Sequence, residues 1–309
     1  MKMPRLKTYV FWVAAFFLGA SAHAAEAEFK IASFNAAFCR NTADLKNWEM
    51  RKAFVMPLVE KNGVDICCMQ EPYAFQVRYL QTQTKFYEFV GQLSGFESPK
   101  LFADRPDNFS SANIILSNMN NPIWYKRAQF EILENGKFWL SKTPSTPSGG
   151  FDQKRFDSER HCVWARFKHL HTGIEFWVFN VHVLCGKSPE DPEQIESAKL
   201  LISKIKEISG NGTFLLCGDF NSEENSGTLR TLLASGMREA SAISREPLKG
   251  EKSTFTGYDD KSSKRLDYIF VSNDVEVYQV EIYDTMKAGL RISDHRPISA
   301  VVKIKKQPL

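Results

Sequence analysis

Acidic and amide side chains stand at the ends of several apolar segments of this 309-residue sequence. In LLCGDFN (215–221), an extended chain would point Asp219 and Asn221 to one side and Phe220 to the other, because side chains alternate along a strand. Other polar residues close or follow similar apolar runs, namely Asn35, Glu71, Asn180, His182, Asp267, Asp294 and His295. Each alone is typical of a turn, a strand end or a core histidine, but their repetition indicates one shared site.

The atoms that these residues offer favour a hard divalent cation. Carboxylates at the ends of buried strands would repel one another unless a cation or hydrogen-bond donors offset the cost. The available ligands are oxygens, which suits Mg²⁺ or Mn²⁺. The sequence has no G-x-S-x-G, H-E-x-x-H, P-loop or G-x-G-x-x-G motif. Cys185 lies close to His182 and is weighed as a thiol nucleophile, but nothing else in the sequence indicates its activation.

Short β-rich runs surround these residues and predict the strands that position them. The runs are FKIASFN, VDICCMQE, SANIILS, KFWLS, HCVWARF, IEFWVFNVHV, TFLLCGDFN, LDYIFVS, VEVYQVEIY and RPISAVVKI. Helices are predicted over 43–63, where Pro57 should kink the helix, and over 191–210, with Pro192 near the start and Gly210 at the end. Residues 141–160 predict a long surface loop. The order of elements indicates a two- or four-layer α/β domain.

The first 24 residues predict a secretory leader. Lys2, Arg5 and Lys7 precede the apolar run YVFWVAAFFLGA, and Ala22 and Ala24 satisfy the small-residue rule for cleavage after Ala24. Loss of these three cations takes the 40 Lys and Arg to 37, against 36 Asp and Glu. The mature protein is therefore nearly neutral, which gives little support for nucleic-acid binding by bulk charge.

Six cysteines in an exported chain permit disulfides, but their spacing does not indicate a disulfide framework. Cys67, Cys68 and Cys217 lie in apolar runs that predict buried thiols. The remaining three, Cys39, Cys162 and Cys185, are the candidates for oxidation.

The ordered set of motifs resembles the endonuclease/exonuclease/phosphatase superfamily, the DNase I-like metal-dependent phosphoesterases. The matching residues are Asn35, Gln70 and Glu71 in QE, Asn180 and His182 in NVH, Asp219 and Asn221 in GDFN, Asp267 in RLDYIF, and Asp294 and His295 in SDHRP. The resemblance covers Phe29 to Lys305, and the segment GKFWLSKTP with Arg160 and Trp164 is similar to a bacterial branch. Pro57 and the Cys67–Cys68 pair depart from the family pattern.

The resemblance implies an α/β fold, a four-layer α/β/β/α sandwich of two mixed β-sheets formed by residues 25–309. It implies that Asn35 and Glu71 bind Mg²⁺ or Mn²⁺ with Asp294 nearby, that His295 is the general base, and that Asp267 orients it. The resemblance further implies that Asp219 and Asn221 position the nucleophile and the phosphate group. It also implies that His182 donates a hydrogen bond to a phosphate oxygen or to the leaving group. Arg160 and Asn180 are candidate substrate contacts, although a surface ion pair for Arg160 is weighed equally.

These roles predict an exported hydrolase of phosphodiester bonds, in the first place a nuclease. The alternatives are a phospholipid or sphingomyelin phosphodiesterase, an inositol- or sugar-phosphate phosphatase, and an inactive binding module. The expected partner is a phosphate-ester substrate, for which nucleic acid and phospholipid are the kinds considered. No obligate protein partner is expected, and the expected state is a monomer. Residues 91–108 and 144–159 are expected to form specificity loops, since loops around a common pocket set specificity.

Overall fold

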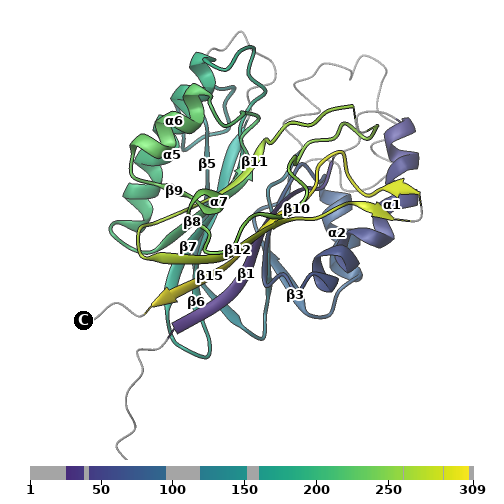
Figure 1. The fold of residues 1–309 in the computed structure, drawn as a ribbon, viewed down its shortest axis with the longest axis horizontal. Coiled ribbons are helices and arrows are strands. Elements are labelled where there is room, and N and C mark those ends of the chain that lie inside the picture. Colours follow the sequence, from purple (N-terminus) through teal and green to yellow (C-terminus); the bar gives the residue numbers. More distant parts are fainter. Residues whose placement is uncertain are drawn as a thin grey trace, which may run out of the picture.

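The computed structural model describes residues 26–37, 42–94, 119–151, 160–259, 261–287 and 289–305. Two large β-sheets face each other, and helices cover the outer side of each sheet (Figure 1). The predicted leader, Cys39 and the predicted strand SANIILS lie outside the described residues, as do parts of both predicted specificity loops.

The first sheet, sheet A, contains seven strands and mixes parallel with antiparallel pairs. In spatial order they are β10 (Lys249–Gly250), β12 (Val275–Ile282), β15 (Ile298–Lys305), β1 (Glu26–Asn35), β2 (Ile66–Gln70), β4 (Ile123–Lys126) and β3 (Tyr87–Val90). The parallel β1–β2 pair brings the carboxyl ends of both strands to one rim, where Asn35 is in register with Gln70.

The second sheet, sheet B, contains six strands and is also mixed. In spatial order they are β5 (Phe130–Trp139), β6 (His161–His169), β7 (Glu175–His182), β8 (Phe214–Asp219), β11 (Asp267–Val271) and β9 (Arg238–Glu239). A small hairpin of β13 (Met286–Lys287) and β14 (Leu290–Arg291) stands apart. Only β7 and β8 run parallel in sheet B, so both end at the same rim.

The core between the sheets follows from the alternation of side chains. Phe29 and Ile31 of β1 point to the same face as Asn35, and they pack against Phe176 and Val178 of β7. The rings of Phe29 and Phe176 stack with centroids 4.9 Å apart. The inner faces of both sheets are thus apolar along most of their length and become polar at one end.

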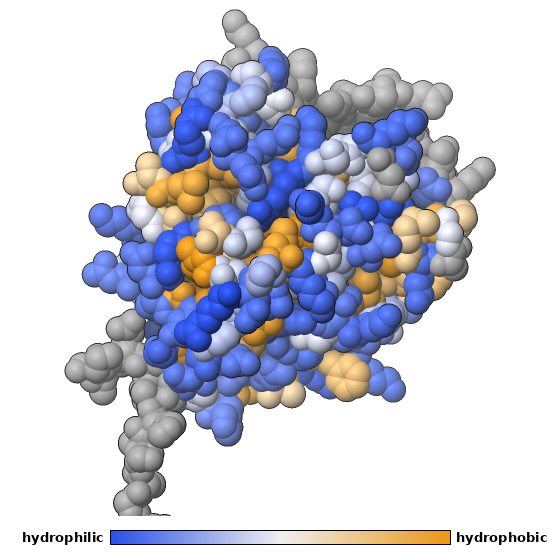
Figure 2. Space-filling view, viewed as in Figure 1, coloured by the Kyte–Doolittle hydropathy of each residue, from blue (hydrophilic) through white to orange (hydrophobic). Residues whose placement is uncertain are grey.

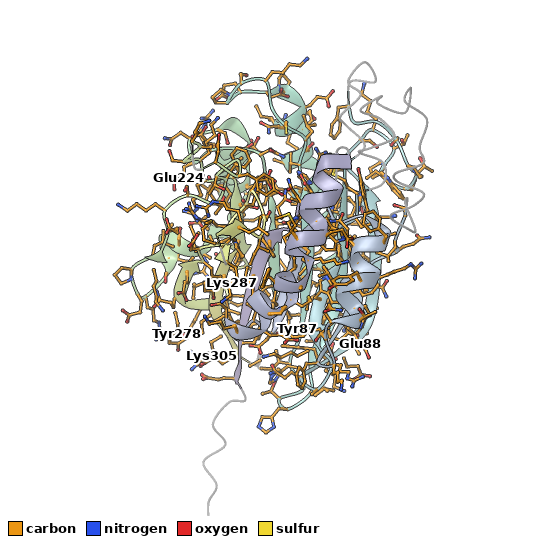
Figure 3. All side chains as sticks on the ribbon, turned by 90° about the vertical axis from the view of Figure 1, so that its right-hand side faces the viewer. Tyr87, Glu88, Glu224, Tyr278, Lys287 and Lys305 are labelled. Atoms are coloured by element: carbon orange, nitrogen blue, oxygen red, sulfur yellow. The ribbon has the colours of Figure 1, made fainter. Side chains whose placement is uncertain are left out.

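Helices cover the outer faces. These are α1 (Thr42–Lys61) and α2 (Ala74–Thr82) on sheet A, and α5 (Pro192–Ser209) and α6 (Gly227–Ala234) on sheet B, with a short α7 (Ala240–Ile243) beside β9 and β11. Figure 3 shows α1 and α2 in front of sheet A, with Tyr87 and Glu88 of β3 near the lower end of α2. The four-layer α/β/β/α order of the mixed sheets is therefore confirmed.

The two predicted helices are present, with one difference. Helix α5 begins after Asp191, whose carboxylate accepts from the backbone N–H groups of Glu193 and Gln194. It ends at Ser209 and is capped by Gly210, which has a φ of 59°. Helix α1 continues through Pro57 and ends at Lys61, so the proline does not terminate it. Val55, Met56 and Val59 of α1 pack on sheet A and hold the helix in place on both sides of the proline.

Figure 2 shows the face of the molecule that is turned to the viewer in Figure 1. This face carries hydrophilic side chains with separate apolar patches among them. Patches interrupted in this way are ordinary for a protein surface. Among the described residues, no helix has the length and hydropathy needed to cross a membrane.

Candidate active site

Three polar side chains form a row across the rim of sheet B. His182 at the end of β7 is in register with Asp219 at the end of β8, and Asp219 is in register with Asp267 at the start of β11. Directly paired residues point to the same face and have neighbouring Cβ atoms. The strand pairing therefore fixes the order His182, Asp219, Asp267 before any side-chain contact is considered.

Gly218 allows this close pairing. A Cβ atom on Gly218 would lie 2.2 Å from the carbonyl oxygen of Val181 on the neighbouring strand. Only glycine lets the two backbones approach so closely without moving one of them. The glycine of GDFN is thus required for the close pairing of β7 and β8 and does not form a turn.

Sheet A supplies two amides that reach across to sheet B. Asn35 donates from Nδ2 to Asp219 Oδ2 over 2.9 Å, and Gln70 donates from Nε2 to Asn180 Oδ1 over 2.8 Å. Asn35 Oδ1 accepts from the backbone N–H of Ala37 over 3.0 Å. Asn35, predicted as a metal ligand, therefore also holds Asp219 in place, and the two hydrogen bonds join the sheets at the rim.

Asn180 does not lie where a substrate-binding residue is expected. Its side chain is fully buried, and Nδ2 donates to the carbonyl oxygens of Met69 and Pro122 over 2.7 and 3.1 Å. With Gln70 on Oδ1, the amide is engaged on both sides. We therefore correct the sequence-based expectation: Asn180 positions the rim of sheet A behind the site and does not line the cavity.

His295 and Asp267 form a buried pair. His295 Nδ1 lies 2.8 Å from Asp267 Oδ2, while His295 Nε2 faces Asp219 Oδ2 at 3.7 Å. Burial lowers the pKa of His295, but the carboxylates of Asp267 and Asp219 outweigh burial and raise this pKa well above its usual value. The ring of Phe255 packs on the imidazole with centroids 4.9 Å apart. The pair has the geometry expected for an oriented base.

Asp219 is the central carboxylate of the site. It is 1% exposed and lies between His182 Nε2 at 3.5 Å and His295 Nε2 at 3.7 Å. Burial, and then the neighbouring Asp267, raise the pKa of Asp219 to about 7. A carboxylate that is this costly to ionise is well suited to bind a cation, because the cation's charge offsets the cost.

Arg160 contacts His182 from the other side of the ring. The guanidinium Nη1 lies 2.7 Å from His182 Nδ1, and both side chains are buried, with Arg160 5% and His182 3% exposed. Burial, and then the positive charge of Arg160, lower the pKa of His182 well below its usual value. Of the two interpretations of Arg160, the structure thus supports a site residue over a surface ion pair.

Two residues that follow strands of the site adopt left-handed backbone conformations. Glu71, directly after β2, has φ of 77°, and Asn221, two residues after β8, has φ of 48°. The conformation is unfavourable for glutamate and better tolerated by asparagine. Such strain is retained where the surrounding structure fixes it, commonly at functional sites. In both cases the backbone turn directs the side chain into the cavity.

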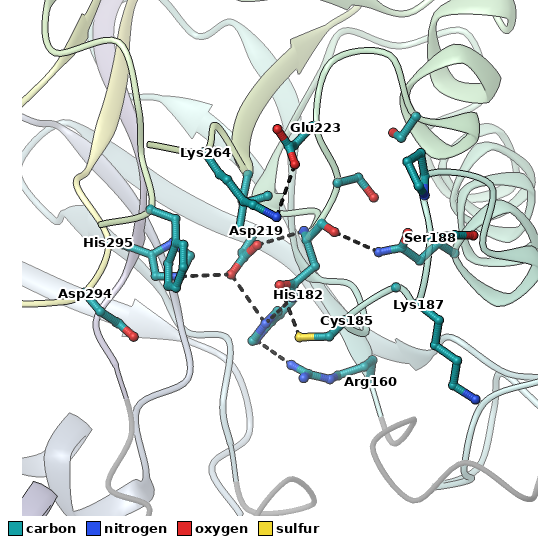
Figure 4. Close-up of a pocket in the computed structure, with 18 of the residues that line it drawn as sticks. Arg160, His182, Cys185, Lys187, Ser188, Asp219, Glu223, Lys264, Asp294 and His295 are labelled. Carbon is teal, nitrogen blue, oxygen red and sulfur yellow. Dashed lines mark hydrogen bonds and ion pairs between the residues drawn. The ribbon is translucent and has the colours of Figure 1, made fainter. Parts of the chain in front are cut away.

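A cavity of about 750 Å³ opens over these residues. Glu71, Asp219, Asn221, Asp294 and His295 line it together with Arg160 and His182. The facing wall comes from the segment between β7 and α5 and from the segments around Glu223 and Lys264, which form an ion pair (Figure 4). The structure thus gathers the predicted site residues around one cavity, with Asn35 and Asp267 behind its wall and Asn180 further back.

Several residues of the cavity were not predicted as site residues. Gln194 in the first turn of α5 donates to the carbonyl oxygens of Leu184 and Asn221, over 2.9 Å each, and so connects the two loops. Its signal in the sequence is a polar residue on the buried face of a predicted helix. Cys185 lines the cavity, and its thiol donates to Asn221 Oδ1 over 3.3 Å.

The carboxylates fit a hard divalent cation. Glu71, His182 and Asp219 offer atoms that lie within 4.8 Å of one another, and so do Asp219, Asp267 and His295. Among the described residues these two groups share Asp219, the buried carboxylate with the raised pKa. Glu71 and Asp219, with Asp294 on the same wall, are the residues that would hold the cation.

The described cysteines Cys67, Cys68, Cys162, Cys185 and Cys217 are free thiols. Cys67, Cys68 and Cys217 are buried as expected, and burial raises the pKa of the Cys67 thiol. Cys162, one of the candidates for oxidation, is also buried, whereas Cys185 is exposed.

The fold and the rim of carboxylates and histidines define a phosphoester hydrolase, and comparison with known proteins gives the family. The sequence model of the Endonuclease/Exonuclease/phosphatase family matches residues 32–295, and the chain belongs to this family. The confirmed resemblance therefore rests on the whole described fold and not on the motifs alone.

Particular relatives agree with this assignment. The structure of a mannosyl-6-phosphatase from Bacteroides thetaiotaomicron is 26% identical, covers 89% of this chain and 99% of its own, and superposes with a TM-score of 0.72. An endonuclease/exonuclease/phosphatase from Bacteroides vulgatus is 25% identical, with 90% and 100% coverage and a TM-score of 0.74. Nocturnin of Drosophila melanogaster is 26% identical over 61% of this chain and 26% of its own length.

Proposed function

We propose that the protein is an exported Mg²⁺- or Mn²⁺-dependent phosphatase that hydrolyses small phosphate monoesters, with sugar phosphates as the first class to test. The observation that carries the proposal is the oriented His295–Asp267 pair beside Asp219 on the wall of a concave cavity. This arrangement places a base next to a site for a cation and a phosphate group.

The residues divide the work as follows. Asp267 accepts from His295 Nδ1–H, which leaves Nε2 as the nitrogen that faces the cavity. A cation held by Asp219 would offset one of the carboxylate charges that raise the pKa of His295, so that Nε2 could take a proton from the attacking water. Arg160 and His182 donate to the phosphate oxygens from the opposite side of the cavity. A bound divalent cation would supply the charge that polarises a phosphoryl oxygen. Glu71 and Asp219 would hold it, with Asp294 nearby and with Asn35 fixing the orientation of Asp219.

The charges that line the cavity favour a small phosphate ester over a nucleic acid. Among the described lining residues the cations are Arg160, Lys187 and Lys264, and Lys264 is paired with Glu223 at 3.3 Å. A nucleic-acid backbone needs a track of several unpaired cations. The similarity to a mannosyl-6-phosphatase supports the same choice. The nuclease predicted from the sequence is therefore the alternative that the experiment must distinguish from the phosphatase.

A substrate panel tests the proposal. The mature protein with Mg²⁺ or Mn²⁺ would be given mannose 6-phosphate, an aryl phosphate monoester, a bis-aryl phosphate diester, plasmid DNA, RNA and sphingomyelin, with His295→Ala as the control. We expect metal-dependent release of phosphate from the monoesters that exceeds cleavage of every diester. Rapid nicking of plasmid without release of phosphate from monoesters would favour the nuclease instead.

We propose export on the basis of the leader in residues 1–24. The first described strand, β1, begins at Glu26, so cleavage after Ala24 would leave it whole. Mass spectrometry of protein recovered from outside the cytoplasm should show a chain that begins at Ala25. Recovery of that material with Met1 intact would contradict the proposal. We also propose that the mature chain acts as a monomer, which size-exclusion chromatography with light scattering would check.

A further inference from the structure

His182 and His295 are both buried in the candidate active site, but different kinds of partner hold their Nδ1 atoms. A carboxylate contacts His295 Nδ1, whereas a guanidinium contacts His182 Nδ1. We propose that Arg160 is a positioning residue that keeps Nδ1 of His182 without a proton and so fixes His182 as a neutral Nε2–H donor aimed into the cavity. The inference concerns the same site as the proposed phosphatase and rests on that function for its catalytic meaning.

The contact between Arg160 and His182 allows only one direction of donation. A guanidinium carries five N–H donors and no acceptor, and it stays charged at every pH relevant to a protein. Arg160 Nη1 lies 2.7 Å from His182 Nδ1, which is a short hydrogen-bond distance. If Nδ1 carried a proton, two donors would face each other at this distance beside a full positive charge. Nδ1 must therefore accept, and the proton of a neutral imidazole must be on Nε2.

The surroundings of Nε2 agree with a proton at that atom. Asp219 Oδ2 lies 3.5 Å and Glu71 Oε1 3.8 Å from Nε2, so the nearest charged neighbours on this side are negative. A proton on Nε2 is attracted by both carboxylates, and a bare Nε2 lone pair would be repelled by them. The two sides of the ring thus favour the same tautomer.

One contact favours the opposite tautomer and must be weighed. Asn221 Nδ2 lies 3.1 Å from His182 Nε2, which would be a hydrogen bond if Nε2 were bare. Asn221 Nδ2 has two N–H groups, of which one donates to the carbonyl oxygen of Val183 over 2.8 Å, while the Cys185 thiol donates to Oδ1 and so fixes the orientation of the amide. A bare Nε2 would accept from the second N–H of this neutral amide, but it would force the guanidinium, a full cation at 2.7 Å, against a protonated Nδ1. The Arg160 contact therefore decides the tautomer.

The fold makes the Arg160–His182 contact rigid. Arg160 directly precedes β6, and the antiparallel register pairs Cys162 with Val181, so Arg160 reaches the end of β7 next to His182. The backbone of Leu140 also donates to the Arg160 carbonyl oxygen over 2.7 Å. Both side chains are almost completely buried, so water cannot readily replace either partner. A fixed neutral donor costs no reorganisation when charge develops on a phosphate oxygen.

Nitrogen NMR tests the inference directly. The mature protein with ¹⁵N-labelled histidine would be studied at pH 7, with and without Mg²⁺, and the His182 signals would be assigned by their absence in His182→Gln. Long-range ¹H–¹⁵N correlations show which ring nitrogen carries a proton. We expect a bare Nδ1 and a protonated Nε2 for His182, and a protonated Nδ1 for His295. A proton on Nδ1 of His182 in the unaltered protein would overturn the inference.

Arg160→Met tests whether the arginine is responsible. Methionine fills a similar space without a donor or a charge, so no cation then opposes a proton on Nδ1, while Asp219 and Glu71 still attract the proton on Nε2. We therefore expect His182 to carry protons on both ring nitrogens in this variant at pH 7. The control is Arg166→Met in β6, the strand that Arg160 precedes. Arg166 pairs with Glu134 and Glu175 at the surface, so this variant should leave the His182 signals unchanged. A bare Nδ1 in Arg160→Met would show that Arg160 does not set the tautomer.

Kinetics give a second readout. Loss of one preorganised donor commonly lowers turnover by about 10²-fold, and we expect a loss of that order in kcat/KM for phosphate monoesters in Arg160→Met. Arg166→Met should retain the full rate. The spectra report the tautomer whether or not a given ester is hydrolysed, so a wrong substrate class and a wrong role for Arg160 give different results. An unchanged kcat/KM in Arg160→Met would contradict the catalytic part of the inference.

Discussion

The two sides of the active site contain the same side chain in opposite electrostatic surroundings. On one side, Asp267 and Asp219 raise the pKa of His295, while on the other side burial and Arg160 lower the pKa of His182. Both imidazoles are buried, His182 at the end of β7 in sheet B and His295 in the segment that leads into β15 of sheet A. Burial lowers the pKa of both imidazoles, so the opposite directions of the two shifts follow from the charges beside them, two carboxylates for His295 and a guanidinium for His182.

The largest expected effect is on the His295 side. His295→Ala should lower kcat by about 10²- to 10⁴-fold, since that is the usual cost of losing a general base. Asp267→Asn should cause a similar loss, because its Oδ2 is the partner that orients Nδ1. The double variant should be close to the worse single variant, since the two residues act as one unit.

The measurement is steady-state kinetics on a phosphate monoester, with circular dichroism to verify folding. Losses that multiply in the double variant would separate Asp267 from His295. Asp267 would then serve the site in another way, as a metal ligand or a structural carboxylate.

The next effect concerns Asp219, which lies between the two histidines. Its pKa of about 7 is raised above the usual value, so the free protein binds a proton at Asp219 below pH 7. In the metal-free protein this group therefore stabilises the fold most at pH below 4, and the contribution is lost as pH rises toward 7. Because a cation needs the ionised carboxylate, metal affinity should fall as pH drops below 7.

Titration calorimetry in two buffers of different ionisation enthalpy measures the protons released. We expect Mg²⁺ binding near pH 6.5 to release protons and binding near pH 9 to release fewer. Asp219→Asn should weaken binding and remove the release near pH 6.5. Equal release at both pH values in the unaltered protein would show that Asp219 is already ionised in the free site.

The smallest expected effect is on Asn180, which supports both sides from behind. Asn180→Leu removes three buried hydrogen bonds, to Gln70 and to the carbonyl oxygens of Met69 and Pro122, which should cost about 1–3 kcal/mol of stability. Gln70 Nε2 would still donate to Ser33, and the Pro122 carbonyl oxygen would still accept from the Met69 N–H. If Asn180 does not contact substrate, KM should change little while the denaturation midpoint falls. A large rise in KM with unchanged stability would restore the original expectation of a substrate contact.

The parts of the fold that the sequence predicted are those with strong local patterns. Long apolar runs such as that of β8 and the capped repeat of α5 specify their structure locally. Short elements such as β4 and α6 were missed, because four or eight residues carry too little periodicity and are stabilised by packing on neighbours. Pro57 lies inside α1 without ending it, because residues of α1 on both sides of the proline pack on sheet A, and the kink expected there stays a prediction.

The site residues that belong to sequence motifs could be predicted. The contacts that depend on how the strands pair were harder to predict. His295, Asp267 and Asp219 were assigned from the ordered motifs, and the structure brings them together. The contact of Arg160 with His182 depends on the register of β6 against β7, which is set by the hairpin and not by either residue. Asn180 was misplaced because alternation tells which face a side chain takes, not how deep it lies.

The hydrogen bonds from Asn35 to Asp219 and from Gln70 to Asn180 give the site a mechanical property. Together with the hydrogen bonds from Asn180 to the carbonyl oxygens of Met69 and Pro122, they tie the rim of one sheet to the rim of the other. Side chains such as Phe29 and Phe176 set the thickness of the layer below. The distance between Asn35 and Asp219 therefore measures how far apart the sheets stand. A methyl group added deep in that layer would push the sheets apart and move Asp219 away from both histidines. The geometry of the pocket therefore depends on core residues that the substrate does not contact.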